Sequence, residues 1–94
     1  MEIIKKVKWV GKSGFNRQMA PEISKICNKF KCRIMFENKT LGASGNNVLL
    51  LKTLNVLPGA QLTMIFEGED AKYAWTAIRD LFIHKAGVTE EQFE

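Results

Sequence analysis

The sequence predicts an α+β fold, an open-faced β-sandwich in which a four-stranded antiparallel sheet is covered on one face by three helices, in the order β-α-β-β-α-β-α. Three observations predict it. The 94 residues, 46% of them hydrophobic, suit a single core, which we place in one domain at residues 1–88. The strand-like segments alternate apolar and polar residues, as a sheet with one wet face requires, whereas the strands of doubly wound parallel sheets are apolar throughout. Two other segments have apolar residues at helical spacing.

The first strand and the first helix follow from a change in apolar periodicity. Residues 3–10 alternate isoleucine, valine and tryptophan with lysines, which indicates a half-buried strand. In residues 20–30 the apolar side chains recur every three or four positions, so we expect a helix with one buried stripe. Pro21 has no N–H and is tolerated only in a first turn, so this helix should begin late, near Gln18 or Met19.

The middle of the chain predicts a hairpin followed by a short helix. Residues 32–37 alternate, the next two residues are Asn-Lys, which is turn chemistry, and residues 40–43 can return as a strand. Residues 48–54, Val-Leu-Leu-Leu-Lys-Thr-Leu, are helix-prone and too few for a long helix. We expect about two turns, with Asn47 as the N-cap.

The last third of the chain predicts a strand, a long helix and a tail. Residues 60–67 alternate after a Pro-Gly turn, and Glu69 or Asp70 should then cap the helix, which Gly87 ends. Residues 89–94 are acidic, and we expect them to fray. The inward positions of all these elements give a predicted core of Ile23, Ile26, Phe30, Ile34, Phe36, Leu62, Met64, Phe66, Trp75, Ile78 and Phe82.

The charge is distributed unevenly along the chain. Net charge is +4, of which residues 1–33 carry +7 and residues 67–94 carry −4. A basic segment suits an acidic protein, a phosphate or nucleic acid, although a solvated face is the commoner explanation of such a run. Nucleic acid is the weaker choice, because Lys6 and Lys8 share a strand face and only Trp9 offers a stacking platform.

The cysteines and the apolar runs argue against a metal site or a membrane anchor. Cys27 and Cys32, with His84 as the single histidine, supply too few ligands for structural zinc. We expect two reduced thiols in or near the core, and no cofactor. The longest apolar run, residues 48–51, is far too short to cross a bilayer, and the N-terminus lacks the layout of a signal peptide. We therefore expect a cytoplasmic protein that binds no membrane.

Several motifs occur in register with this element order. Residues 14–20 read Gly-Phe-Asn-Arg-Gln-Met-Ala, Phe30 ends the first helix, residues 58–59 form a Pro-Gly turn, and residues 66–71 read Phe-Glu-Gly-Glu-Asp-Ala. Together they resemble the family of the phosphocarrier protein HPr of the bacterial sugar phosphotransferase system, which has Gly-Leu-His-Ala-Arg-Pro-Ala at the first motif and Lys-Gly at the turn. The resemblance covers residues 2 to about 86, and each motif alone would be weak.

The resemblance implies a chain without the family's two phosphorylation sites. In the family, enzyme I phosphorylates a histidine, which passes the phosphoryl group to sugar-specific enzyme IIA proteins. That histidine aligns with Asn16, the arginine that neutralises the phosphate with Gln18, and the regulatory serine of Gram-positive members with Asn47. An amide lacks the nucleophilic ring nitrogen of imidazole and a hydroxyl group, so we expect no catalytic or regulatory residue. His84 is better explained as a helix-end residue, and Ser44 is a poor substitute serine.

The resemblance also implies a protein-binding surface. Family partners dock on the loop before the first helix and on the short helix, where about half of the short helix's apolar residues should face inward. The corresponding residues here are Phe15, Arg17, Met19, Val48, Leu49, Leu51 and Lys52. A remnant anion site would comprise Asn16, Arg17 and Lys12.

These implied sites favour one function over two alternatives. The favoured one is a binding or regulatory module acting on enzyme I, enzyme IIA or a transcriptional regulator. One alternative is a genuine phosphocarrier with unconventional chemistry. The other is nucleic-acid binding through the basic N-terminal third.

Overall fold

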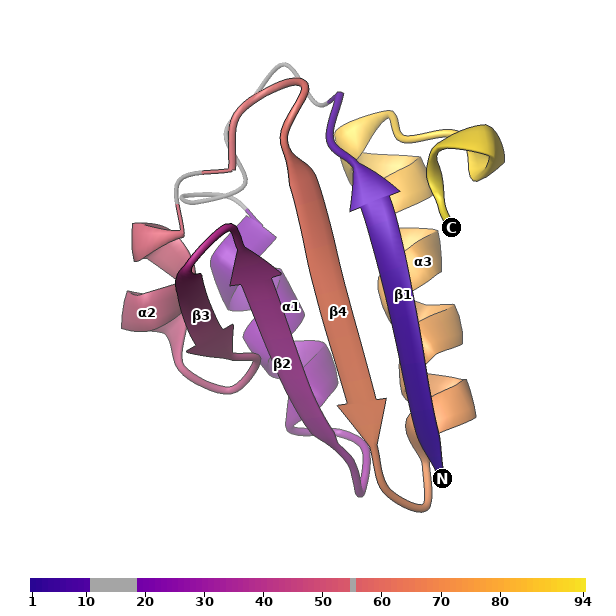
Figure 1. The fold of residues 1–94 in the computed structure, drawn as a ribbon. Coiled ribbons are helices and arrows are strands. Elements are labelled where there is room, and N and C mark those ends of the chain that lie inside the picture. Colours follow the sequence, from indigo (N-terminus) through magenta and orange to yellow (C-terminus); the bar gives the residue numbers. More distant parts are fainter. Residues whose placement is uncertain (11–18, 55) are drawn as a thin grey trace.

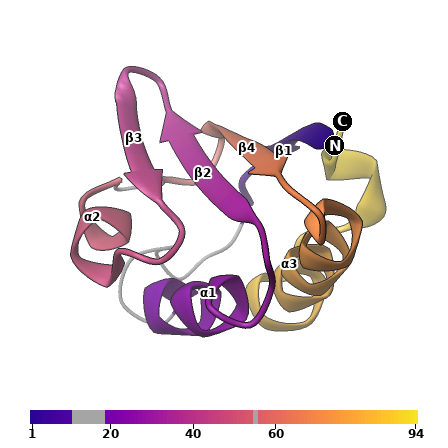
Figure 2. The same ribbon diagram turned by 90° about the horizontal axis from the view of Figure 1, so that it is seen from below.

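Four antiparallel strands form one sheet in the computed structural model, which describes residues 1–10, 19–54 and 56–94. From one edge of the sheet to the other the strands are β1 (Glu2–Lys8), β4 (Gln61–Glu67), β2 (Arg33–Asn38) and β3 (Leu41–Ser44) (Figure 1). The described α-helices are α1 (Met19–Cys27), α2 (Val48–Thr53) and α3 (Ala71–Ala86). All three cover the same face of the sheet and leave the other face open (Figure 2). The predicted open-faced α+β fold is confirmed.

Alternation along the strands separates the buried face from the open one. On β4, which pairs with both β1 and β2, Leu62, Met64 and Phe66 are fully buried. The residues between them point to the open face and are only partly buried. The predicted hairpin is also present: Asn38 pairs with Leu41 across a two-residue turn.

The first helix ends earlier than the sequence predicts. Among the described residues α1 begins at Met19, and the residues before it lie outside the described chain, so the late start expected from Pro21 stays a prediction. The helix ends at Cys27, so the prediction that it reaches Phe30 is wrong. The segment that follows α1 is bound to the start of α3. The Lys31 amide donates to Asp70 Oδ2 over 2.8 Å, and the Asp70 amide donates to the Lys31 carbonyl over 3.1 Å.

The structure confirms the predicted C-cap of α3 but not the predicted side-chain cap at its N-terminus. Gly87 ends the helix in the left-handed conformation, with φ 74°, as expected. Asp70 occupies the N-cap position, but its side chain makes no capping bond to α3. Its carboxylate ties the segment after α1 to the start of α3 instead.

None of the described helices is both long and apolar enough to span a membrane.

The core lies between the sheet and the helices. Trp9 and Phe82 are both fully buried and meet edge to face, with ring centroids 5.2 Å apart. The prediction that Ile26, Phe30 and Trp75 belong to the inner core is wrong, because these three side chains are only partly buried and pack against its margin. The buried hydrophobic residues of the described chain are Val7, Trp9, Met19, Ala20, Ile23, Cys27, Ile34, Phe36, Ala43, Leu51, Leu54, Val56, Leu62, Met64, Phe66, Ala71, Ala74, Ile78, Leu81, Phe82 and Val88.

The C-terminal tail (residues 89–94) docks on the edge of the sheet, so the prediction that it frays is wrong. The Glu94 amide donates to the Lys6 carbonyl over 2.7 Å, and the Lys6 amide donates back over 3.2 Å. Phe93 packs edge to face on Trp75 with ring centroids 5.3 Å apart, and Glu90 forms an ion pair with Arg79. The backbone hydrogen bonds, the ring contact and the ion pair together anchor the tail beside β1 (Figure 1).

Candidate functional site

The described part of the predicted site consists of the start of α1 and the whole of α2. Met19 and the α2 residues lie within the described chain. The other predicted site residues lie outside the described residues: Lys12, Phe15, Asn16, Arg17 and Gln18. The phosphorylation position, its arginine position and the remnant anion site therefore stay predictions from sequence.

Asn47 is the N-cap of α2, as predicted. Its backbone is extended, with φ −112° and ψ 96°, and its Oδ1 accepts a hydrogen bond from the Leu50 amide over 3.1 Å. The Ser44 hydroxyl donates to Asn46 Oδ1 over 2.7 Å in the preceding loop. Asn47, which the sequence resemblance aligns with the regulatory serine of that family, thus carries a side-chain amide that accepts a backbone hydrogen bond.

Loss of this cap should have a measurable cost. Asn47→Ala removes the acceptor for the Leu50 amide, and we expect the free energy of unfolding to fall by about 0.5–2 kcal/mol. Asn47→Ser keeps an oxygen acceptor at the same position and should unfold nearly as the wild type does. Urea denaturation measures both variants. Equal stability of the alanine and serine variants would show that the cap does not contribute.

The four apolar residues of α2 are distributed between the side of the helix that faces the core and the side that faces solvent. Leu51 is fully buried, whereas Leu49 is 75% exposed and Leu50 is 44% exposed. Val48 is partly buried against the core, and Lys52 is exposed. Leu50 is not among the contact residues predicted from sequence, although the helical phase set by buried Leu51 places its side chain outside. We call Leu49, Leu50 and Lys52 the α2 surface.

Two residues predicted to contact a partner cannot do so from the folded chain. Met19 is only 4% exposed, because it begins the apolar stripe that α1 buries against the core. Leu51 is 0% exposed, because it is the inward-facing residue of α2. Both predictions are wrong. Val48, Leu49 and Lys52 stay candidates for contact.

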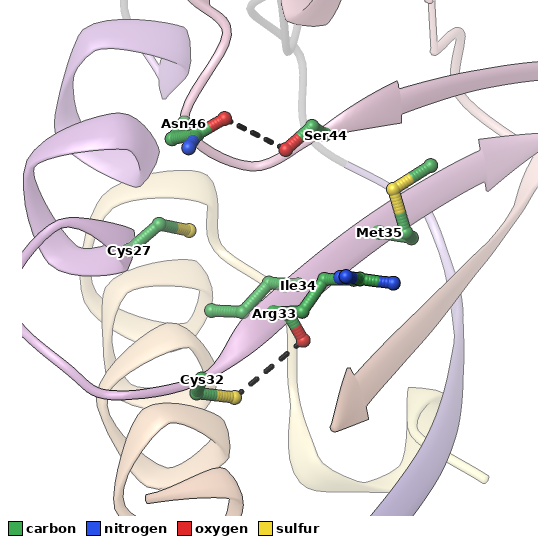
Figure 3. A pocket seen from close by; sticks show the side chains of 7 residues that line it. All are labelled: Cys27, Cys32, Arg33, Ile34, Met35, Ser44 and Asn46. Carbon is green, nitrogen blue, oxygen red and sulfur yellow. Dashed lines mark hydrogen bonds between the residues drawn. The ribbon is translucent and has the colours of Figure 1, made fainter. Parts of the chain in front are cut away.

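The two cysteines lie beside a hollow of about 530 Å³ next to the exposed end of β2 (Figure 3). Burial raises the pKa of the Cys27 thiol to about 12, and the neighbouring Cys32 adds to the rise. Burial also raises the pKa of Cys32, whose Sγ donates to the Arg33 carbonyl over 3.5 Å. Both are free, as predicted, and at neutral pH they are thiols with little nucleophilic character. The hollow is lined by Cys27, Cys32, Arg33, Ile34, Met35, Ser44 and Asn46.

Other candidate groups for chemistry are separate from α2 in the fold. His84 is exposed in the last turn of α3, where a cation is favoured by the helix dipole. Trp9 is fully buried, so the stacking platform considered for nucleic acid is not available. Within residues 1–10, 19–54 and 56–94, no three His, Cys, Asp or Glu side chains cluster as metal ligands.

A family model matches most of the chain. The model described as the PTS HPr component phosphorylation site matches residues 3–84. No curated protein sequence resembles the chain closely enough to count as a match.

Solved structures share the fold. The phosphocarrier protein HPr of Bacillus anthracis superposes with a TM-score of 0.74 at 23% identity, covering 82% of this chain and 92% of its own. The HPr-C-His structure of Thermoanaerobacter tengcongensis gives 0.78 at 22% identity, covering 95% of this chain and 98% of its own. The histidine-containing phosphocarrier protein of Mycoplasma gives a TM-score of 0.84 at 19% identity, covering 95% of this chain and 99% of its own. The residues matched by the family model run from β1 into α3 and leave the C-terminal tail outside.

Proposed function

Because this chain belongs to the HPr family of the phosphotransferase system, we propose that it is a protein-binding module of that system that carries no phosphate on a histidine. One observation carries the proposal. The 94 residues contain a single histidine, His84, which lies in the last turn of α3 rather than in the motif before α1. Asn16 occupies the aligned position of the family histidine. Its amide nitrogen cannot attack a phosphoryl group, because its lone pair is delocalised into the carbonyl.

The α2 surface supports the binding half of this proposal. Leu49 and Leu50 expose apolar side chains beside the cation of Lys52, and an apolar centre with a charged rim is typical of protein interfaces. Asn47 keeps the helix capped without offering a hydroxyl for phosphorylation. The module would therefore present a constant surface, because neither Asn16 nor Asn47 can be phosphorylated as the family's histidine and serine are. Enzyme I is the partner we propose to test first.

A competition assay tests both halves of the proposal. A genuine histidine-containing HPr is phosphorylated by enzyme I and labelled phosphoenolpyruvate in the presence of rising amounts of this chain. We expect no acid-labile label on this chain, because it has no imidazole at the phosphorylation position. We also expect slower labelling of the genuine HPr, because the two proteins would compete for the same surface of enzyme I.

Matched variants separate binding at the α2 surface from a general effect of added protein. Leu49→Asp places a charge in the apolar centre and should relieve the competition, whereas Tyr73→Asp alters a 66% exposed side chain on α3 and should not. Acid-labile label on the wild-type chain would establish the alternative, a genuine phosphocarrier. If the genuine HPr is labelled at its usual rate in the presence of this chain, enzyme I is not the partner.

A further inference from the structure

An apolar row crosses the open face of the sheet. The strand register pairs Ile4 with Ile65 and Ile65 with Met35, so these residues lie side by side on β1, β4 and β2. Their side chains point away from the helices, because they alternate with the buried residues of the same strands. Ile4 is 54% exposed, and the other two are partly exposed. No described helix lies over this row (Figure 2).

Charges flank the row, and their sign reverses across it. On β1 the exposed residues two positions either side of Ile4 are Glu2 and Lys6. On β2 the residues two positions either side of the row are Arg33 and Glu37, also exposed. Glu2 and Arg33 lie on one side of the row, level with Glu67 of β4, and Lys6 and Glu37 lie on the other. Within two positions of the row, the open face of each of these two strands therefore carries one charge of each sign. Lys8, four positions beyond Ile4 on the same face of β1, lies outside this pattern.

This pattern is complementary to itself under a two-fold rotation. A two-fold axis along the apolar row, midway between two facing sheets, stacks each strand antiparallel on its own copy. Ile4, Ile65 and Met35 then meet their own copies. Glu2 faces Lys6 of the partner subunit, and Arg33 faces Glu37 of the partner subunit. Two sheets packed face to face lie about 10 Å apart with strands about 30° from parallel, which these side chains can span.

We propose that the open sheet face is an interface between two copies of this chain. A partner of uniform charge would be attracted by Lys6 and repelled by Glu2, whereas a second copy satisfies both. The C-terminal tail pairs with the outer edge of β1, where Gln92 and Glu94 line a hollow together with Lys6 and Lys8. It lies beside β1 at the edge of the sheet and leaves the apolar row uncovered. The α2 surface lies on the helix side, so a dimer would present two copies of it (Figure 2).

The dimer should be weak and sensitive to salt. Four short strands spaced about 4.8 Å apart give each subunit a contact face of only a few hundred Å², against about 800 Å² in stable complexes. Four exposed ion pairs then supply orientation more than affinity. We therefore expect association to appear only as the concentration rises, and to weaken as salt is added.

Charge reversal in sedimentation velocity tests the interface. The wild-type sedimentation coefficient should rise with concentration toward that of a dimer. Glu2→Lys and Lys6→Glu should each weaken association about tenfold, because like charges then face each other twice across the axis. An equal mixture of the two variants should associate again, because every reversed charge on one chain then meets its opposite on the other. The reversal Lys72→Glu on exposed α3 is the matched control and should change nothing.

Amide NMR on dilution locates the contact. Shifts concentrated at β1, β4 and β2 support the proposal, and circular dichroism confirms that the variants are folded. The proposal is overturned by a wild-type chain that stays monomeric at every concentration, by single reversals that associate as the wild type does, or by a mixture that does not associate. Dilution shifts confined to α2 or to the C-terminal tail would overturn it as well, by placing the contact elsewhere.

Discussion

Ile78→Ala should lower the free energy of unfolding by roughly 2–5 kcal/mol. Ile78 is fully buried at the middle of α3, which packs against α1, β1 and β4. Shortening it removes apolar contacts and leaves a cavity that these elements can fill only by shifting together. Urea unfolding followed by the fluorescence of the two tryptophans, buried Trp9 and partly buried Trp75, gives the change directly.

Two alanine substitutions calibrate this result. Ile26→Ala should cost less, because that side chain is only partly buried. Tyr73→Ala should change stability by no more than about 0.5 kcal/mol, because Tyr73 is 66% exposed on the same helix as Ile78. If Ile78→Ala unfolds at the wild-type midpoint, the assignment of the inward face of α3 is wrong.

Gly68→Ala should be comparably damaging for a different reason. Gly68 has φ 139°, a conformation that side chains rarely adopt, at a cost of roughly 1–3 kcal/mol. A Cβ there would also lie 2.9 Å from the Lys31 carbonyl oxygen and 3.1 Å from the Cys32 Cα. The backbone of Lys31 cannot move freely, because it is bonded to Asp70 in both directions. We expect a loss of more than about 2 kcal/mol.

Alanine substitutions at two other glycines, Gly59 and Gly42, separate the cost of backbone strain from the cost of steric clash. Gly59→Ala tests strain alone, because φ is 92° and nothing lies within 4 Å of the added Cβ. Gly42→Ala tests neither, because its nearest neighbour would be 3.8 Å away and its φ is not positive. Thermal unfolding should rank the variants Gly42, Gly59, Gly68 in order of increasing damage. Equal effects at Gly59 and Gly68 would mean that the contact with Lys31 costs nothing.

The fold could be predicted from sequence because its signals are local. Alternation along β4, the spacing of apolar residues in α3 and the capping chemistry of Asn47 and Gly87 each depend on a few neighbouring residues. The register of the sheet follows from the same alternation, because a slip of one residue would turn the buried side chains of β4 to the solvent.

What could not be predicted depends on contacts between distant segments. Asp70 has the residue type and position of a helix cap, and only the fold brings the Lys31 amide to its carboxylate. The C-terminal tail has the composition of a frayed end, and only the position of Trp75 gives Phe93 a place to pack. Met19 is an apolar residue at a helix start, which is compatible with exposure or burial until α1 is oriented.

The position of β1 at the sheet edge has a consequence for how the chain is made. β1 is synthesised before every other described element, whereas its strand partner β4 follows β2, β3 and α2 along the chain and its edge partner in the C-terminal tail follows α3. Until then a segment of high strand propensity is exposed to other nascent chains. Lys5, Lys6 and Lys8 interrupt its apolar residues, and such charges disfavour pairing between unfolded copies. The basic character of this strand thus also protects the chain during the interval before its own sheet can close.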